Sequence, residues 1–185
     1  RQWSRGLGDV YKRQEIPSLL SGSLENEALI RNIASELYNS NDILYVGRGV
    51  SHGLALEGAL KLKEISYIHA EGYAAGELKH GPIALIDENV PVIGIIPFND
   101  LFDKTLSNLA EINARGGKII AITDAKGLDK VKEISDHNII IPNCASFCQP
   151  ILCAIVVQLL AYHIAVFKGT DVDQPRNLAK SVTVE

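Results

Sequence analysis

Hydrophobic residues follow two different patterns along the chain. Short runs of consecutive apolar residues are typical of strands that are buried on both faces of a sheet. Four such runs lie at 43–46, 92–96, 118–122 and 138–141. Between them, apolar residues recur with the 3.6-residue period of a helix, which predicts helices at 23–37, 53–65, 100–114, 128–134 and 147–167. Ser23 is expected to cap the first helix, and Gly116 and Gly169 are expected to stop the helices that precede them.

Buried strands that alternate with helices predict an α/β fold: a three-layer, doubly wound, flavodoxin-like domain with a mainly parallel sheet and helices on both faces. Such sheets bind ligands at the carboxyl ends of their strands, where the strand order reverses. The loop Gly47–His52 leaves the first strand at that edge and resembles a phosphate-binding turn. It lacks the third glycine of a dinucleotide fingerprint, and no P-loop pattern occurs, so no cofactor is expected.

Composition limits the kinds of partner. With 185 residues, 46% of them apolar, one domain with one substantial core is expected. The net charge of −4 argues against nucleic acid or an anionic membrane as a partner. The longest apolar run is interrupted by Gln158 and His163 before it reaches the ~18 residues of a membrane span.

Cys144, Cys148 and Cys153 lie close together but have no neighbouring histidine pair. We interpret them as core thiols rather than metal ligands, and no metal site is expected. Their odd number favours a reducing compartment, the cytoplasm.

The chain contains no methionine, and Arg1–Gln14 shows neither helical nor strand periodicity. We interpret residues 1–14 as a non-native or disordered extension of a fragment. The predicted domain then covers 15–170, and a carboxyl-terminal tail covers 171–185.

The helix at 53–65 carries an unusual charged stripe. At 100° per residue, Glu57, Lys61 and Glu64 lie within roughly 60° of one another. Leu54 and Leu60 border the stripe. One interpretation is a surface ion pair, worth a few tenths of a kcal/mol. The other is a carboxylate and an amine held in a cleft or subunit interface, where their pKa values suit proton transfer.

Ionisable side chains are also dense between His69 and Pro82. This segment includes His80, which precedes a Gly-Pro turn signal. Together with residues 57–65 (EGALKLKEI), the stretches 69–71 (HAE) and 76–82 (GELKHGP) resemble the second sugar-isomerase (SIS) domain of the glucosamine-6-phosphate synthase family, the isomerizing glutamine–fructose-6-phosphate aminotransferases. The tail at 169–185 is similar to the carboxyl terminus of that family, so the resemblance covers 43–185.

The resemblance implies an activity, the conversion of fructose 6-phosphate and glutamine-derived ammonia to glucosamine 6-phosphate. It implies that Lys180 forms a Schiff base with the open-chain ketose and that Glu64 moves a proton between C1 and C2. Lys61 would stabilise the negative charge that develops on the sugar. His80 would open the sugar ring in the site of the neighbouring subunit, which implies a homodimer.

The resemblance also assigns the tail. Ala179 and Lys180 would contact the sugar, and Arg176 and Asn177 would order the closure of the tail over it. The family holds the sugar phosphate with an S-x-S-G-x-T loop in its first SIS domain, and no such loop occurs here. With that domain and the glutaminase domain missing, little or no synthesis is expected from this chain alone.

Two other functions stay open. One is a stand-alone sugar-phosphate isomerase or deglycase, which would need its own phosphate loop. The other is a non-catalytic sugar-phosphate sensor, as found attached to transcription regulators. A sensor has no need of Glu64, His80 and Lys180 together, so replacing Lys180 with alanine separates the two classes.

Overall fold

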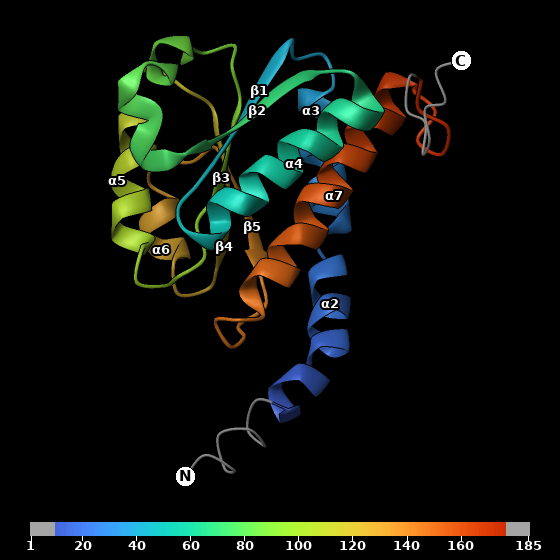
Figure 1. Ribbon diagram of the computed structural model, residues 1–185, viewed down its shortest axis with the longest axis vertical. Helices are drawn as coiled ribbons and strands as arrows, with labels where there is room; N and C mark the ends of the chain where they lie inside the picture. Colours follow the sequence, from blue (N-terminus) through green and yellow to red (C-terminus); the bar gives the residue numbers. More distant parts are fainter. Residues whose placement is uncertain (1–9, 177–185) are drawn as a thin grey trace, which may run out of the picture.

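The computed structural model describes residues 10–176. Its centre is a five-stranded, all-parallel sheet with the strand order β2-β1-β3-β4-β5 (Figure 1). The strands are β1 (Asp42–Gly47), β2 (His69–Ala74), β3 (Val92–Ile95), β4 (Ile119–Asp124) and β5 (His137–Ile141). The α-helices are α2 (Ile16–Leu24), α3 (Glu27–Leu37), α4 (Val50–Ser66), α5 (Phe102–Asn113), α6 (Leu128–Val131) and α7 (Gln149–Lys168). Two 3₁₀ helices, η1 (Ala75–His80) and η2 (Pro82–Leu85), follow β2.

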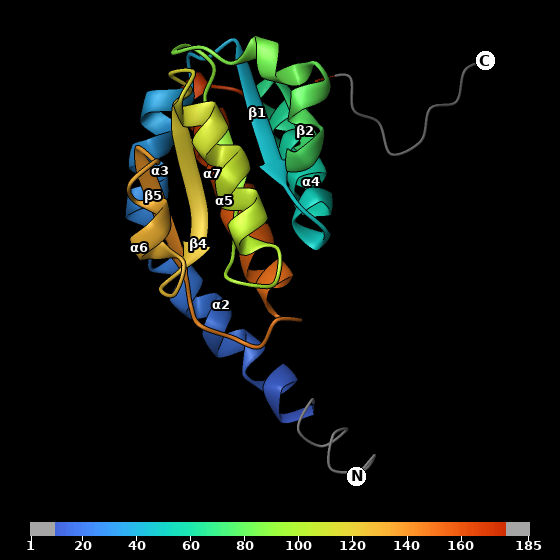
Figure 2. The ribbon, with the colours of Figure 1, turned by 90° about the vertical axis from the view of Figure 1, so that its left-hand side faces the viewer.

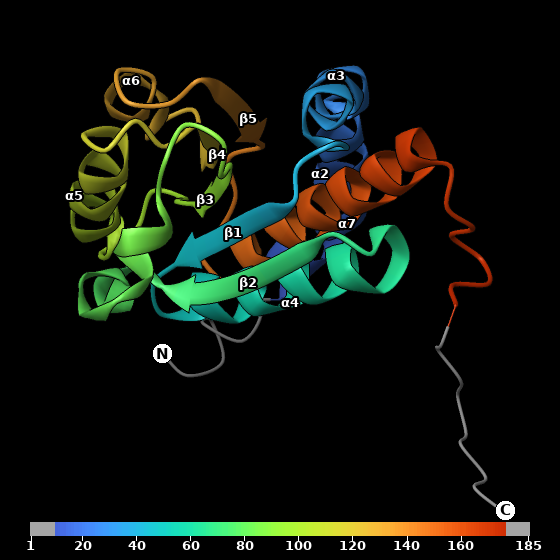
Figure 3. The ribbon, with the colours of Figure 1, turned by 90° about the horizontal axis from the view of Figure 1, so that it is seen from above.

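Helices cover both faces of the sheet (Figures 2 and 3). One core joins the sheet to α3, α4 and α7 and includes Tyr45, Ile93 and Ile122. The other core joins it to α5, α6 and η1 and includes Val46, Leu109 and Val131. Alternate residues of β1, β3 and β4 therefore enter opposite cores, which is why these strands read as continuous apolar runs. The predicted three-layer, doubly wound α/β fold is confirmed.

Helix α7 is the central helix of the first core. It is long and apolar enough to cross a membrane by length and composition, with a mean hydropathy of 2.1, despite Gln158 and His163. Half of that window is buried within the domain, where α7 packs against α4 and α3. Its contacts are those of a core helix.

The predicted helix at 23–37 is in fact two helices, α2 and α3, and the cap assigned to Ser23 was wrong. Ser23 lies inside α2, where it is buried and its Oγ donates a hydrogen bond to the carbonyl of Leu19 at 3.2 Å. The chain bends at Glu25 and Asn26 because Asn26 Nδ2 donates to the Ile140 carbonyl of β5 at 2.9 Å. A hydrogen bond to a residue distant in sequence thus ends α2, although the helical pattern of apolar residues continues past this point.

Strand β2 was not predicted from the sequence. It pairs with β1 over all six of its residues and forms an edge of the sheet. Its apolar side faces α4, where a Cβ on Gly72 would lie 2.7 Å from the backbone of Ala55 and Leu56. Its other side carries His69, Glu71 and Tyr73, so the strand has no continuous apolar run.

The helix ends agree with their sequence signals. Gly116 and Gly169 have positive φ values of 80° and 72°, and the chain turns at each of them.

Residues 10–14, ahead of α2, are helical and exposed. The boundary drawn after residue 14 stays a prediction.

Candidate functional site

The charged stripe of α4 contains a close ion pair. Lys61 Nζ lies 2.7 Å from Glu64 Oε2, and the two side chains are 36% and 26% exposed. The hydrogen bond that Lys61 donates to Glu64 raises the pKa of Lys61. The negative charges of Glu64 and Glu57 also raise this pKa, whereas partial burial lowers it. Lys61 therefore stays a cation, held beside a carboxylate on the outer side of the helix.

Apolar side chains border this pair on both sides. Leu54 and Ile65 pack against the core. Leu56 and Leu60, on the other side, are 49% and 44% exposed. The arrangement differs from a solvated helix face, because large apolar groups stand in solvent directly beside a half-buried ion pair.

The chain after α7 returns to the carboxyl-terminal end of α4. Thr170 Oγ1 donates to the Ile65 carbonyl at 2.6 Å, and the Arg176 N–H donates to Tyr67 Oη at 2.8 Å. The Arg176 guanidinium lies 4.2 Å from the centre of the Tyr67 ring, a cation–π contact. Tyr67 itself ends α4 in the left-handed conformation, with φ of 60°. The start of the tail is thus attached directly beyond Glu64, at the end of the domain away from the strand arrowheads (Figure 3).

Three residues assigned to the tail, Asn177, Ala179 and Lys180, lie outside the described residues. Arg176, the last described residue, is anchored on Tyr67. Glu64 precedes Tyr67 by three residues, about 5 Å along the helix axis.

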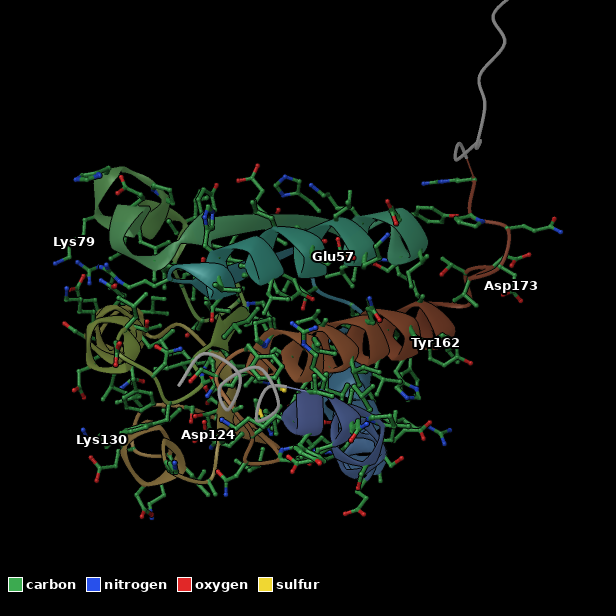
Figure 4. All side chains as sticks on the ribbon, turned by 60° about the horizontal axis from the view of Figure 1, so that its bottom comes forward. Glu57, Lys79, Asp124, Lys130, Tyr162 and Asp173 are labelled. Carbon is green, nitrogen blue, oxygen red and sulfur yellow. The ribbon has the colours of Figure 1, made fainter. Side chains whose placement is uncertain are left out.

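His80 does not join this group within one chain. It ends η1, its side chain is 73% exposed, and its Nδ1 lies 2.8 Å from Glu77 Oε2. Helix α4 rises ~21 Å between its first residue, Val50, and Glu64. Gly76 of η1 packs against Arg48, just before α4 begins, so η1 lies at the start of this helix. In agreement, Figure 4 places Lys79 of η1 and Asp173, which follows α7, at opposite ends of the view.

Other reactive groups of the described residues form no further catalytic set. His69 Nδ1 lies 2.6 Å from Asp42 Oδ1, and Tyr73 donates to Glu71, which raises the pKa of Tyr73 to about 12. Within 10–176, no group of three or more His, Cys, Asp or Glu side chains is arranged to hold a metal ion.

The three thiols are free. Burial raises the pKa of Cys144 to about 11 and that of Cys153 to about 12, so these two are poor nucleophiles.

Sequence reasoning missed Tyr67 and Thr170. Neither residue type signals a helix end, and a positive φ is uncommon outside glycine. The loop predicted at 47–52 is shorter than expected, because α4 begins at Val50. Arg48, Val50 and Ser51 from this stretch line a cavity of about 320 Å³, which does not include Glu57, Lys61 or Glu64 among its lining residues.

A doubly wound parallel sheet with helices on both faces places the chain in the class of three-layer α/β domains. The family model of the SIS domain matches residues 36–168. The chain belongs to the SIS domain family.

Similar proteins identify a more specific group within the SIS domain family. The chain is 63% identical over 176 residues to the isomerizing glutamine–fructose-6-phosphate aminotransferase of Bradyrhizobium diazoefficiens, which covers 95% of this chain and 29% of that protein. It is 57% identical over 171 residues to the enzyme of the same name from Zymomonas mobilis, covering 92% of this chain and 28% of that protein. The chain thus spans less than a third of the length of these relatives.

Solved structures agree. The carboxyl-terminal domain of glucosamine-fructose-6-phosphate aminotransferase from Francisella tularensis matches with a TM-score of 0.81 and 45% identity, over 87% of this chain and 45% of that chain. The sugar-isomerase domain of an RpiR transcription factor from Sphaerobacter thermophilus matches with a TM-score of 0.73 at 22% identity, over 87% of this chain and 91% of that chain. This second likeness shows the fold alone.

Proposed function

We propose that this chain is the carboxyl-terminal isomerase part of a glutamine–fructose-6-phosphate aminotransferase, and that it supplies the acid–base and Schiff-base groups of the reaction. One observation carries the proposal. The Arg176–Tyr67 contact attaches the tail to the end of α4 that holds the Lys61–Glu64 pair. Lys180, four residues further along the chain, would act together with these two groups.

The chemistry follows from these three side chains. The Lys180 amine adds to the C2 carbonyl of open-chain fructose 6-phosphate and water leaves, which gives a Schiff base. Ammonia from glutamine then replaces the lysine at C2. Glu64 removes a proton from C1 and returns it to C2, which converts the ketose imine into the aldose amine. The cationic Lys61 stabilises the negative charge that develops between these two transfers.

His80 calls for a second subunit. It lies at the opposite end of α4 from Glu64, so it would reach this site only from a neighbouring copy of the chain. We therefore propose a homodimer in which His80 opens the sugar ring of the adjacent site. The exposed Leu56 and Leu60 are neighbours one turn apart on α4 and together form an apolar patch beside the ion pair. Such a patch supports a cover by another domain.

The proposed reaction also needs a phosphate-binding site and a source of ammonia. We propose that a first SIS domain holds the sugar phosphate and that a glutaminase domain supplies ammonia, both outside this chain. Little or no glucosamine 6-phosphate is expected from the 185-residue chain by itself. The free thiols Cys144, Cys148 and Cys153 support a cytoplasmic location for the whole enzyme.

A chimera tests the proposal. This chain would replace the matching carboxyl-terminal part of the Bradyrhizobium diazoefficiens relative, and glucosamine 6-phosphate formation would be measured. Lys180→Ala is expected to lower the rate at least about a hundredfold, whereas Lys126→Ala, at an exposed turn, leaves it unchanged. Borohydride in the presence of fructose 6-phosphate should add the reduced sugar phosphate to Lys180. Unchanged turnover of Lys180→Ala would overturn the proposal and favour a sensing module.

A further inference from the structure

Helix η1 carries two ionisable side chains next to each other on its outer side. Glu77 Oε2 lies 2.8 Å from His80 Nδ1. A 3₁₀ helix has three residues per turn, so side chains three positions apart stand one above the other. The side chains of Glu77 and His80 are 68% and 73% exposed, so the pair is open to a molecule that approaches from outside this chain.

The other side of η1 is fixed to the domain. Leu78 is only 1% exposed and belongs to the core that η1 shares with α5. Lys79 Nζ lies 2.9 Å from Glu111 Oε1 of α5. Gly81 follows η1 with a φ of 145°, a backbone conformation that favours glycine, and the chain turns there. His80 therefore stands at the end of a fixed helix, directly before a turn.

The contact with Glu77 determines which ring nitrogen of His80 is free. An ionised carboxylate only accepts hydrogen bonds, so Nδ1 carries the proton that Glu77 accepts. A neutral imidazole has a single N–H, so its Nε2 is then an unprotonated acceptor. When a second proton binds, Nε2 becomes a donor and the bond from Nδ1 to Glu77 remains. Nε2 is thus the nitrogen that can exchange a proton with a bound molecule.

We propose that Glu77 is a positioning residue for His80, which rests on the function proposed above, in which His80 opens the sugar ring of the adjacent site. Glu77 holds the Nδ1–H tautomer and directs Nε2 toward the sugar. In ring opening, Nε2–H gives its proton to the ring oxygen while the bond between C2 and that oxygen breaks. Nε2 then takes the proton of the C2 hydroxyl, whose oxygen becomes the carbonyl oxygen, so the imidazole returns to its starting state.

The alternative for Glu77 and His80 is an ordinary surface ion pair with no role in the reaction. Asp129 and Lys132 form such a pair at the same spacing of three residues, with Oδ1 and Nζ 2.6 Å apart. Their side chains are 85% and 55% exposed, which is close to the exposure of Glu77 and His80. Asp129→Asn is therefore the matched control for a change at Glu77.

Kinetics of the chimera test the role of Glu77. Glu77→Gln places an amide beside Nδ1, and the amide N–H can donate to Nδ1, which favours the other tautomer. This change should lower kcat about 10- to 100-fold with little change in KM, the range for a lost group that orients a histidine. His80→Ala should lower kcat at least as far. In the His80→Ala background, Glu77→Gln should cost nothing more, because Glu77 acts through His80. Asp129→Asn should leave kcat unchanged.

The tautomer of His80 gives a readout that does not depend on catalysis. NMR correlation spectra of the ring nitrogens in the 185-residue chain, with isotope-labelled histidine, distinguish Nδ1–H from Nε2–H. The neutral His80 ring is expected to be the Nδ1–H tautomer in the wild type. In Glu77→Gln it should change to Nε2–H, the tautomer that free histidine favours in water.

The outcomes separate this role from the proposed function. Additive losses in the double variant, equal losses in Glu77→Gln and Asp129→Asn, or an Nε2–H tautomer in the wild type would each overturn the role of Glu77. Full kcat for Glu77→Gln or for His80→Ala, beside a slow Lys180→Ala, would overturn this role alone and leave the proposed function standing. Full turnover of Lys180→Ala would overturn the proposed function itself.

Discussion

The two ends of helix α4 differ in what they offer a ligand. The carboxyl-terminal end carries an ion pair, a helix-ending tyrosine and the attached tail, and these groups lie on an open surface. The amino-terminal end forms one wall of a cavity of about 320 Å³. The charged pair proposed for proton transfer therefore lies on the surface, at the other end of the helix from the cavity.

This contrast teaches that a cavity and a catalytic set need not coincide in a single domain. In a doubly wound fold, a cavity forms at the carboxyl ends of the strands whatever the function of the domain. If other domains complete a catalytic site, a single domain shows only part of that site, as partly exposed ionisable side chains. Lys61 and Glu64 have that appearance, with exposed leucines beside them.

The largest expected effect concerns the carboxyl-terminal end. Glu64→Gln in the chimera should lower kcat by about 10²- to 10⁴-fold, the range of a lost general acid–base group. Glu57→Gln removes a carboxylate from the same stripe that makes no hydrogen bond to Lys61, and should cost less than about tenfold. Steady-state kinetics of both variants give the comparison. Equal losses would mean that the stripe acts only through its net charge.

The middle of α4 couples both ends to the sheet. A Cβ added at Gly72 of β2 would lie 2.7 Å from backbone atoms of α4, so Gly72→Ala should destabilise the fold by about 1–3 kcal/mol. Gly53→Ala is the matched control, because nothing lies within 4 Å of its added Cβ. That change should stabilise the exposed helix by roughly 0.5–1 kcal/mol. Urea denaturation of the two variants measures the difference, and a stable Gly72→Ala would contradict the close packing.

An element of this fold is predictable from the sequence when the residues that determine it lie within the element itself. Strands β1, β3, β4 and β5 follow from their own apolar runs, and α4 and α7 from their own periodicity. Strand β2 was missed because His69, Glu71 and Tyr73 on its outer side interrupt any apolar run. The bend at Asn26 was missed because its partner, Ile140, is 114 residues away.

The same holds for the candidate site. Helix geometry alone places Lys61 beside Glu64, so that pair was predictable and is present. The attachment of Arg176 to Tyr67 joins residues 109 apart, and no local pattern signals it. The polar stretch at 47–52 was noted from the sequence, but its place beside Gln149 in one cavity wall was not, because the two segments are far apart along the chain.

A smaller effect is expected from the tail anchor. Tyr67→Phe keeps the ring that faces the Arg176 guanidinium but removes the acceptor of the Arg176 N–H. A lost neutral hydrogen bond of about 0.5–1.5 kcal/mol corresponds to a roughly 2- to 10-fold fall in kcat/KM of the chimera. Tyr162→Phe, on the exposed side of α7 (Figure 4), should have no effect. An unchanged kcat/KM for Tyr67→Phe would show that the tail closes without this anchor.

The smallest effect is a pH dependence of stability at the carboxyl-terminal end. Glu64 raises the pKa of Lys61 above its ordinary 10.5, so folding favours the protonated lysine. The stabilisation is therefore fully present below pH 10.5 and is lost as the pH rises through the raised pKa of the folded state. Because both side chains are partly exposed, its size is only a few tenths of a kcal/mol. The difference in unfolding free energy between the wild type and Lys61→Met, measured in urea, should shrink as the pH rises through that raised value. A difference that grows with pH would mean that the pair with Glu64 does not stabilise the charged lysine, and Lys61 would lose the physical basis for its proposed role.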